Sequence, residues 1–262
     1  MARNTRRQAA QDPRDELRQL ALDLDLTALA CGFPDLLAQA EKDTLSYTDF
    51  SLLLLRSERT ARMTRSLTRS LKRSRLGPIE GIDGFDFAAR PQLEPRVVKE
   101  LLNCRFVHEH RNILCLGKPG LGKTRIAKAI AQSACIAGLS TLCVTAAEML
   151  EDLHASQADG TFKRALRRYV KPQLLLLDEF GHDGNFDQKS TNYLYRVVAG
   201  KHRQSSIILT ANSSFVHWKL LFPSESSAVA TVDRLLDRAT VLRFTGKSFR
   251  DPKEIVGAPL DD

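Results

Sequence analysis

The apolar residues in the first third of the chain recur at helical spacing. Leucines and a methionine between residues 15 and 75 follow one another in steps of three and four, which predicts helices. The stretch CGFPD at 31–35 contains glycine and proline, so it is expected to end the first helix. Ser46 and Thr48 in SYTDF are cap-like residues that are expected to precede the next helix.

A different pattern of apolar residues begins at about residue 97, where short apolar runs alternate with helical stretches. This alternation predicts βα units. Because the runs are continuously apolar, they predict a parallel sheet that is covered by helices on both faces. Five runs are the expected strands: NILCLG at 112–117, TLCVT at 141–145, LLLLDEF at 174–180, SIILTAN at 206–212 and TVLRF at 240–244.

A segment rich in glycine and proline, LGPIEGIDGFDFAARPQLEP, separates the two patterns and reads as a linker or a clamped extended segment. The chain is therefore expected to contain five regions. They are a disordered N-terminus at 1–15, a basic helical domain at 16–76 that binds DNA or a partner, a linker at 77–96, an α/β ATPase domain at 97–252 and a C-terminal tail at 253–262.

The composition narrows the class of protein. Apolar residues make up 43% of the chain, which is enough for a packed core. The five cysteines form no CxxC pair and no Cys/His cluster, which favours a reduced cytoplasmic protein without a zinc site. The N-terminus has no apolar signal region, and the longest pure leucine runs are far too short to span a bilayer.

The stretch GKPGLGKT fits the phosphate-binding pattern G-x-x-x-x-G-K-[ST], and it lies between an expected strand and an expected helix. Glycines let backbone N–H groups turn toward phosphates, and the helix N-terminus adds partial positive charge. Lys123 is expected to reach the terminal phosphates, and the Thr124 hydroxyl to ligate Mg²⁺. The candidate ATP-binding residues are Gly117, Lys118, Pro119, Gly120, Leu121, Gly122, Lys123, Thr124 and Arg125.

Two further strand ends carry candidate catalytic residues. Asp178 ends the run LLLLD, where its carboxylate can hold the Mg²⁺ shell, and Glu179 can orient and deprotonate the attacking water. This pair favours hydrolysis over binding alone. Asn212 ends the run ILTAN and is expected beside the γ-phosphate, although asparagine also favours strand-end turns.

The net charge of +8 and pI of about 9.4 favour a polyanionic partner such as double-stranded DNA. Residues 56–75 hold eight basic residues and one acid, and FKRALRRYV forms a second cluster. Both are read as phosphate contacts with little sequence preference, and a solvated basic helix face is the alternative. The candidate DNA-binding residues are Arg59, Arg62, Arg65, Arg69, Lys72, Arg73, Lys163, Arg164, Arg167 and Arg168.

These motifs together resemble the IstB-like helper ATPases of bacterial transposition, which belong to the AAA+ class and are close to the DnaC-type helicase loaders. The resemblance covers about residues 15–252, and its later motifs, ILTAN followed by Trp218 and DRLL…GKSFR, are the specific ones. It implies strand order 5-1-4-3-2, an N-terminal helical domain, and ATP-dependent assembly as a ring or spiral on DNA. It also implies a separate partner transposase, because the chain shows no DDE-type nuclease set of its own.

The resemblance assigns roles to further residues. Asn212 matches the sensor-1 position, Arg234 resembles the arginine finger that completes a neighbouring subunit's site, and Arg250 looks like the sensor-2 arginine. Arg238 remains an alternative finger, and Arg234 can instead be a surface arginine paired with Asp233 or Asp237. Only about a dozen residues follow Arg250, so no C-terminal helical lid is expected.

Several alternatives stay open. A helicase loader would use the same ATPase with an N-terminal domain that grips a helicase. A metabolic kinase would need a lid and a base for its acceptor, and a scaffold without activity would not need Asp178 and Glu179. Phe85 and Phe87 in GFDFAAR are candidates for the wall around the adenine.

Overall fold

The computed structural model describes residues 12–181, 184, 186–213 and 215–248, so Arg250 and the tail expected at 253–262 lie outside the described residues. The chain divides into two compact units, the first ending at Thr68 and the second beginning at Arg69. Among the described helices, none is both long and apolar enough to cross a membrane.

The first unit contains helices α1 (Pro13–Asp23) and α2 (Thr27–Lys42) and most of α3 (Tyr47–Ser74). Ala21, Leu29 and Ala30 form its small core. Asp12 caps α1 by accepting a hydrogen bond from the Arg14 N–H at 2.9 Å. The expected cap of α3 is present as well, because the Ser46 hydroxyl accepts a hydrogen bond from the Asp49 N–H at 3.2 Å.

The first helix ends earlier than the sequence pattern suggests. Residues 31–35 lie inside α2, so the prediction that they end the first helix is wrong. The break lies instead at Leu24–Leu26, where Asp25 takes the left-handed conformation with φ +56°. Pro34 removes one helical hydrogen bond. The neighbouring side chains still pack in the helical form, since Ala30 is buried and the Phe33 ring lies 6.3 Å from the Phe50 ring.

A buried carboxylate fastens α2 to α3. Glu58, on α3, accepts hydrogen bonds from the N–H groups of Ala28 at 2.9 Å and Leu29 at 3.0 Å, so it satisfies amides at the N-terminus of α2. Arg62 Nε and Arg65 Nη2 each lie 3.0 Å from Glu58 Oε1. Burial raises the pKa of Glu58, but the hydrogen bonds from Leu29, Arg62 and Ala28 outweigh it and hold that pKa below its ordinary value.

The second unit is an α/β domain around one five-stranded parallel sheet. The strands are β1 (Ile113–Leu116), β2 (Thr141–Thr145), β3 (Leu174–Phe180), β4 (Ser206–Ala211) and β5 (Thr240–Arg243). Their spatial order is β2-β3-β4-β1-β5, which confirms the expected order 5-1-4-3-2 and the α/β fold class with a parallel sheet. Every expected strand is present, to within one residue at its ends.

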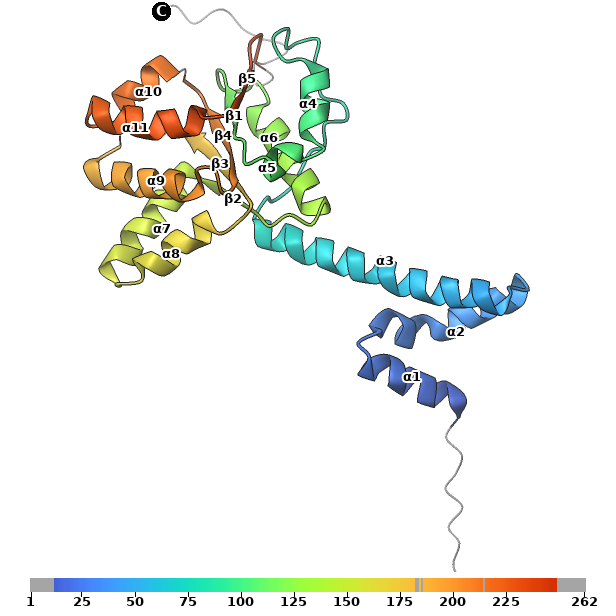
Figure 1. Ribbon diagram of the computed structural model, residues 1–262. Coiled ribbons are helices and arrows are strands. Elements are labelled where there is room, and N and C mark those ends of the chain that lie inside the picture. Colours follow the sequence, from blue (N-terminus) through green and yellow to red (C-terminus); the bar gives the residue numbers. More distant parts are fainter. Residues whose placement is uncertain (1–11, 182–183, 185, 214, 249–262) are drawn as a thin grey trace, which may run out of the picture. The chain divides into compact units, whose positions relative to one another are not determined.

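Helices cover both faces of this sheet (Figure 1). One face carries α4 (Pro95–Leu101), α5 (Arg105–His108) and α6 (Lys123–Ile136). The other carries α7 (Ala146–Ala158), α8 (Phe162–Val170), α9 (Gln188–Lys201), α10 (Phe215–Leu221) and α11 (Glu225–Leu236). Between β5 and Ser248, the described residues form no further helix.

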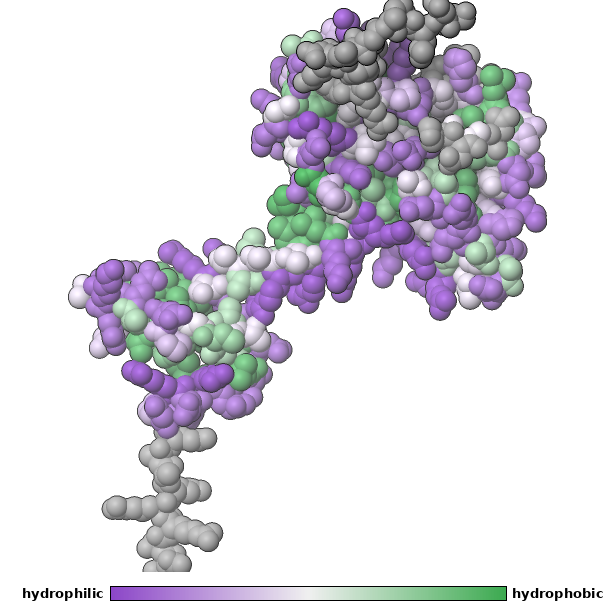
Figure 2. Space-filling model, turned by 180° about the vertical axis from the view of Figure 1, so that it is seen from behind, coloured by the Kyte–Doolittle hydropathy of each residue, from purple (hydrophilic) through white to green (hydrophobic). Residues whose placement is uncertain are grey.

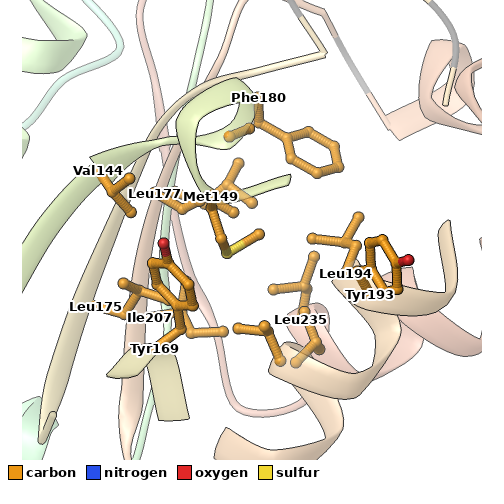
Figure 3. Packing of buried hydrophobic residues seen from close by; sticks show 14 of the residues in the cluster. Val144, Met149, Tyr169, Leu175, Leu177, Phe180, Tyr193, Leu194, Ile207 and Leu235 are labelled. Carbon is orange, nitrogen blue, oxygen red and sulfur yellow. The ribbon is translucent and has the colours of Figure 1, made fainter. Parts of the chain in front are cut away.

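The main core lies between the sheet and helices α7–α11. Alternate residues of the inner strands, such as Leu175 and Leu177 of β3, enter this core, and Met149, Tyr169 and Leu235 meet them from the helices (Figure 3). Trp218 is fully buried there, with its ring 4.7 Å from that of Phe180. The burial of both faces explains why the strands read as continuous apolar runs.

The Glu58 cap generates a stability prediction for the first unit. Glu58→Gln keeps the size of the side chain but removes its charge, so we expect the unit to lose about 2 kcal/mol of unfolding free energy. Because the pKa of Glu58 is lowered on folding, this stabilisation is present above the unfolded pKa of about 4.3 and is lost as pH falls through the folded value. Amide hydrogen exchange at Ala28 and Leu29, followed from pH 7 to pH 4, measures both effects.

Glu41→Gln serves as the control, since Glu41 is an exposed glutamate on α2. It should leave the exchange rates unchanged. Equal protection of Ala28 and Leu29 in wild type and Glu58→Gln at pH 7 would contradict the role of Glu58 as the cap of α2.

Candidate functional site

A glycine-rich loop connects β1 to α6 at the carboxyl edge of the sheet. Gly117 lies so close to β5 that a Cβ there would come within 2.2 Å of the Phe244 carbonyl oxygen. Gly120 and Gly122 have φ of +74° and +88°, which favour glycine. The loop therefore turns into the N-terminus of α6, where free N–H groups and the helix dipole form an anion site.

Lys123 and Thr124 are the first two residues of α6. Lys123 is only 7% exposed, and its Nζ donates a hydrogen bond to the Lys118 carbonyl oxygen at 2.8 Å. The Thr124 hydroxyl donates to Asp178 Oδ1 at 3.0 Å, across to the end of β3. The loop thus places an ammonium group and a hydroxyl–carboxylate pair at the mouth of the anion site.

The end of β3 has an irregular backbone. Glu179 has φ +56° and is exposed, whereas Asp178 before it and Phe180 after it are buried. Thr210, on β4, donates a hydrogen bond to Asp178 Oδ1 and accepts one from the Glu179 N–H at 3.0 Å. Sequence reasoning missed Thr210, although a buried hydroxyl two positions before Asn212 in an apolar strand was a possible signal.

A cleft of about 600 Å³ joins these groups, which is a typical size for a small-molecule site. It brings together most of the loop residues with the two strand ends, so Asn212 lies in the same cleft as Glu179 and Thr210. Gly117, Lys118 and Asp178 are not among its lining residues. The lining consists of Glu80, Gly84, Phe85, Asp86, Pro119, Gly120, Leu121, Gly122, Lys123, Thr124, Arg125, Glu179, Thr210 and Asn212.

The segment expected as a linker forms one wall of this cleft. Arg125 holds it there, since its guanidinium donates to the carbonyl oxygens of Gly81 at 3.0 Å and Asp83 at 2.9 Å and lies 3.3 Å from the Glu80 carboxylate. The same guanidinium is 5.8 Å from the centre of the Phe85 ring. Arg125 therefore acts in this structure as a clamp on the cleft wall.

Two more contacts fix this wall. The Phe87 ring packs edge-on against Phe85 at 4.9 Å, so Phe85 faces the cleft and Phe87 supports it from outside. Arg90 is 1% exposed and donates its Nε–H to the Leu121 carbonyl oxygen at 3.0 Å, inside the phosphate-binding loop. The wall and the loop are thus held as one piece.

Of the remaining candidate arginines, Arg234 and Arg238 are not among the residues that line the cleft. Arg234, on α11, donates to the Ala230 carbonyl oxygen at 2.8 Å, and its guanidinium lies 4.9 Å from the centre of the Tyr195 ring. Asp237 pairs instead with His202 at 2.7 Å and Arg203 at 2.9 Å. Arg238 is exposed with φ +57°, and Arg250 lies outside the described residues.

The cations of α3 fall into two groups. Arg62 and Arg65 are engaged within the first unit, because both pair with Glu58 and Arg62 also donates to the Asp25 carbonyl oxygen at 3.0 Å. Arg59 of the same unit is exposed. Arg69, Lys72 and Arg73 are exposed on the last turns of α3, which belong to the second unit.

The cations of α8 surround a hollow of about 630 Å³ together with Lys171. Lys163, Arg164 and Arg167 are exposed. Arg168 lies 3.0 Å from an Asp152 oxygen, and the same carboxylate accepts a hydrogen bond from the Tyr169 hydroxyl at 2.7 Å. One of the four cations is therefore partly neutralised, and the others face solvent at a concave, positive surface.

The donors present suit magnesium better than a tightly caged metal. Thr124 and Asp178 offer a hydroxyl and a carboxylate oxygen within 3.0 Å of each other. Within the described residues, no three His, Cys, Asp or Glu side chains converge as a metal site. Mg²⁺ is commonly held by one or two protein oxygens, with water and substrate phosphates as its other ligands.

Burial raises the pKa of the nearby Cys115 thiol to about 12, so that thiol stays neutral.

Comparison with known proteins is consistent with this site. The family model of the IstB-like ATP binding protein matches residues 19–255. The chain is 33% identical to the ATP-binding protein of insertion sequence IS5376 from Geobacillus stearothermophilus, over 90% of this chain and 94% of that protein. It is 32% identical to the ATP-binding protein of insertion sequence IS21 from Pseudomonas aeruginosa, over 90% and 88%.

Solved structures resemble the fold at low sequence identity. AMPPCP-bound DnaA from Aquifex aeolicus aligns with a TM-score of 0.53 and 19% identity, over 65% of this chain and 51% of that chain. DnaI aligns with a TM-score of 0.51 and 19% identity, over 57% and 84%. The chain belongs to the IstB-like family of AAA+ ATP-binding proteins found in insertion sequences.

The clamp formed by Arg125 generates a binding prediction. Arg125→Ala removes the hydrogen bonds that hold residues 81–83, so we expect ATP to bind about tenfold more weakly, since one hydrogen bond to a charged group contributes about 1.5 kcal/mol. Titration with a fluorescent ATP analogue measures the affinity, and amide exchange at 81–85 should accelerate.

Lys128→Ala is the matched control, because Lys128 is a cation on the same helix that does not line the cleft. It should bind ATP as wild type does. Weaker binding in Arg125→Ala without faster exchange at 81–85 would mean that Arg125 contacts the nucleotide directly and is not the clamp.

Proposed function

We propose that this chain hydrolyses ATP, assembles on double-stranded DNA in the ATP state, and assists a separate transposase during transposition of an insertion sequence. The observation that supports hydrolysis most directly is the position of Glu179 in the cleft beside the phosphate-binding loop. A carboxylate there can orient and deprotonate the attacking water. A protein that only bound ATP would not need that carboxylate.

Other residues of the cleft complete this reaction in the proposal. Lys123 binds the β- and γ-phosphates, and Asn212 hydrogen-bonds the γ-phosphate or the attacking water. Thr124 and Asp178 would hold Mg²⁺, which would supply positive charge to neutralise the phosphates. Phe85 provides the wall of the cleft against which the adenine of ATP packs.

The proposal of assembly is supported by the position of Arg234. It does not line the cleft of its own chain, so we assign it to the site of a neighbouring subunit as an arginine finger. Its helix also presents apolar surface, since Val229 is 50% exposed and Leu236 is 37% exposed on α11. Exposed apolar side chains beside a functional arginine are typical of a protein interface.

DNA binding is assigned to the cations that face solvent. On α8 these are Lys163, Arg164 and Arg167, around a hollow that also includes Arg168. On α3 they are Arg59, Arg69, Lys72 and Arg73. Arg62 and Arg65 pair with Glu58 and contribute mainly to folding of the first unit. Such contacts reach phosphates, so affinity should fall steeply with salt.

The partner transposase is inferred from the relatives, whose names place them in insertion sequences. The first unit has surface for a protein contact. It exposes Leu20, Leu55 and Met63 at 54%, 63% and 66% among charged side chains, and the space-filling view shows apolar and polar groups intermixed on it (Figure 2).

All five cysteines are free thiols, which fits the reducing cytoplasm.

The central test is the particle mass of the protein with duplex DNA, measured with ATP, ADP or no nucleotide. We expect large complexes only with DNA and ATP. Glu179→Gln should stabilise them, because it preserves the cleft while removing the base that activates water. Glu151→Gln, an exposed glutamate on α7, should behave as wild type. A protein that stays monomeric on duplex DNA in every nucleotide state would contradict the proposal and favour the helicase loader.

The finger assignment is tested by Arg234→Ala. We expect DNA-stimulated ATP hydrolysis to fall by about 10³-fold, since a finger stabilises charge in the transition state, while ATP affinity stays within about threefold. Arg238→Ala is the control one turn away and should retain hydrolysis.

A mixture of Arg234→Ala and Glu179→Gln subunits separates action between subunits from action within one. The second variant can supply its arginine to the intact cleft of the first, so mixing should restore part of the hydrolysis. Full turnover by Arg234→Ala alone would contradict the assignment, and loss in Arg238→Ala would move the finger to that residue.

A further inference from the structure

Thr210 is a polar residue in a strand that is buried along its whole length. Its side chain is 1% exposed, and the strand β4 that carries it runs through the core. A buried hydroxyl without hydrogen bonds costs free energy, so its partners explain its presence. Its hydrogen-bond partners lie on β3, where the hydroxyl donates to the Asp178 carboxylate and accepts from the Glu179 N–H.

The N–H of Glu179 needs this partner because the strand pairing is interrupted at that residue. Leu177 pairs with Leu209, and the next registered pair is Phe180 with Ala211. Three steps along β3 therefore match two along β4, so β3 contains one extra residue, a β-bulge. A residue in such a bulge loses its ladder partner, and the Thr210 oxygen accepts the Glu179 N–H in its place.

The bulge also explains how two adjacent acids serve one site. Successive side chains of a regular strand point to opposite faces of the sheet. Asp178 meets Thr124, and Glu179 lines the same cleft, which an unbroken strand would not allow. The backbone turns at Glu179 with φ +56°, a left-handed conformation that is energetically costly for a residue other than glycine. Something outside β3 must offset that cost.

We propose that Thr210 is a positioning residue for ATP hydrolysis. It holds Glu179 in its left-handed conformation so that the carboxylate points into the cleft, and it fixes the rotamer of Asp178 at Thr124. This inference rests on the proposed function, because it takes Glu179 to be the base. Thr210 lines the cleft, but in this assignment it acts through Glu179 and Asp178 and not on the reacting atoms.

The test compares Thr210→Val with Thr210→Ser. Valine keeps the shape of the side chain but removes the hydroxyl, whereas serine keeps the hydroxyl. We expect single-turnover ATP hydrolysis to fall by about 10–100-fold in Thr210→Val, as for loss of a residue that orients a functional side chain, with ATP affinity within about threefold of wild type. Amide exchange at Glu179 should accelerate. Thr210→Ser should recover both.

Thr141→Val is the matched control. Thr141 is another buried strand threonine, with its hydroxyl donating to the Leu139 carbonyl oxygen at 3.2 Å at the opposite edge of the sheet. It should hydrolyse ATP as wild type does. In a Glu179→Gln background, Thr210→Val should cause a much smaller further loss than in the wild-type background, since the part of its effect that passes through Glu179 is already gone and only the part through Asp178 remains.

Three outcomes would overturn the inference. They are wild-type hydrolysis by Thr210→Val, an equal further loss in the Glu179→Gln background, or unchanged exchange at Glu179. The wild-type protein tests the proposed function separately, because absence of hydrolysis with DNA present would overturn that function. The exchange rate at Glu179 would still decide whether Thr210 holds the bulge.

Discussion

The carboxylate of Asp178 joins the three elements on which the site depends. It ends β3, accepts a hydrogen bond from Thr124 at the start of α6, and accepts another from Thr210 on β4. This contact is possible only because β3 and β4 are neighbours and β1, which leads into α6, lies next to β4. In a parallel sheet the carboxyl ends of such strands share one edge, so strand order alone brings these residues together.

At the same edge of the sheet, the close approach of Phe244 leaves no room for a side chain at position 117, which the sequence shows only as a glycine. Phe244 follows β5, and its N–H donates to the Leu116 carbonyl oxygen at 2.7 Å, just before Gly117. No side chain fits at Gly117, because its Cβ would overlap the Phe244 carbonyl. The first glycine of the phosphate-binding loop is therefore required by packing between strands as well as by the turn, and β5 supports the loop from its far side.

Much of this architecture could be predicted from the sequence, and the exceptions share a physical cause. Buried strands reveal themselves as local apolar runs, and the loop and the acidic pair by local spacing. Thr210 and Glu58 act through partners about thirty residues away, so no local pattern identifies them. Arg125 was predicted from its place after the motif, but its contacts with residues about forty positions away were not. The helix through Pro34 was mispredicted for the same reason, since packing of distant residues outweighs the local preference of proline.

The basic residues of α3 also differ from one another in their contacts, which the sequence does not show. The basic stretch of α3 looks uniform in the sequence, yet Arg62 and Arg65 neutralise the one buried acid among them and tie α3 to residues 25–29. If Arg62 or Arg65 bound a DNA phosphate and displaced its counterion, that arginine would lose its contact with Glu58, which stabilises the fold. The surface available to a polyanion is therefore smaller than the charge count implies, and it shifts toward α8 and the last turns of α3.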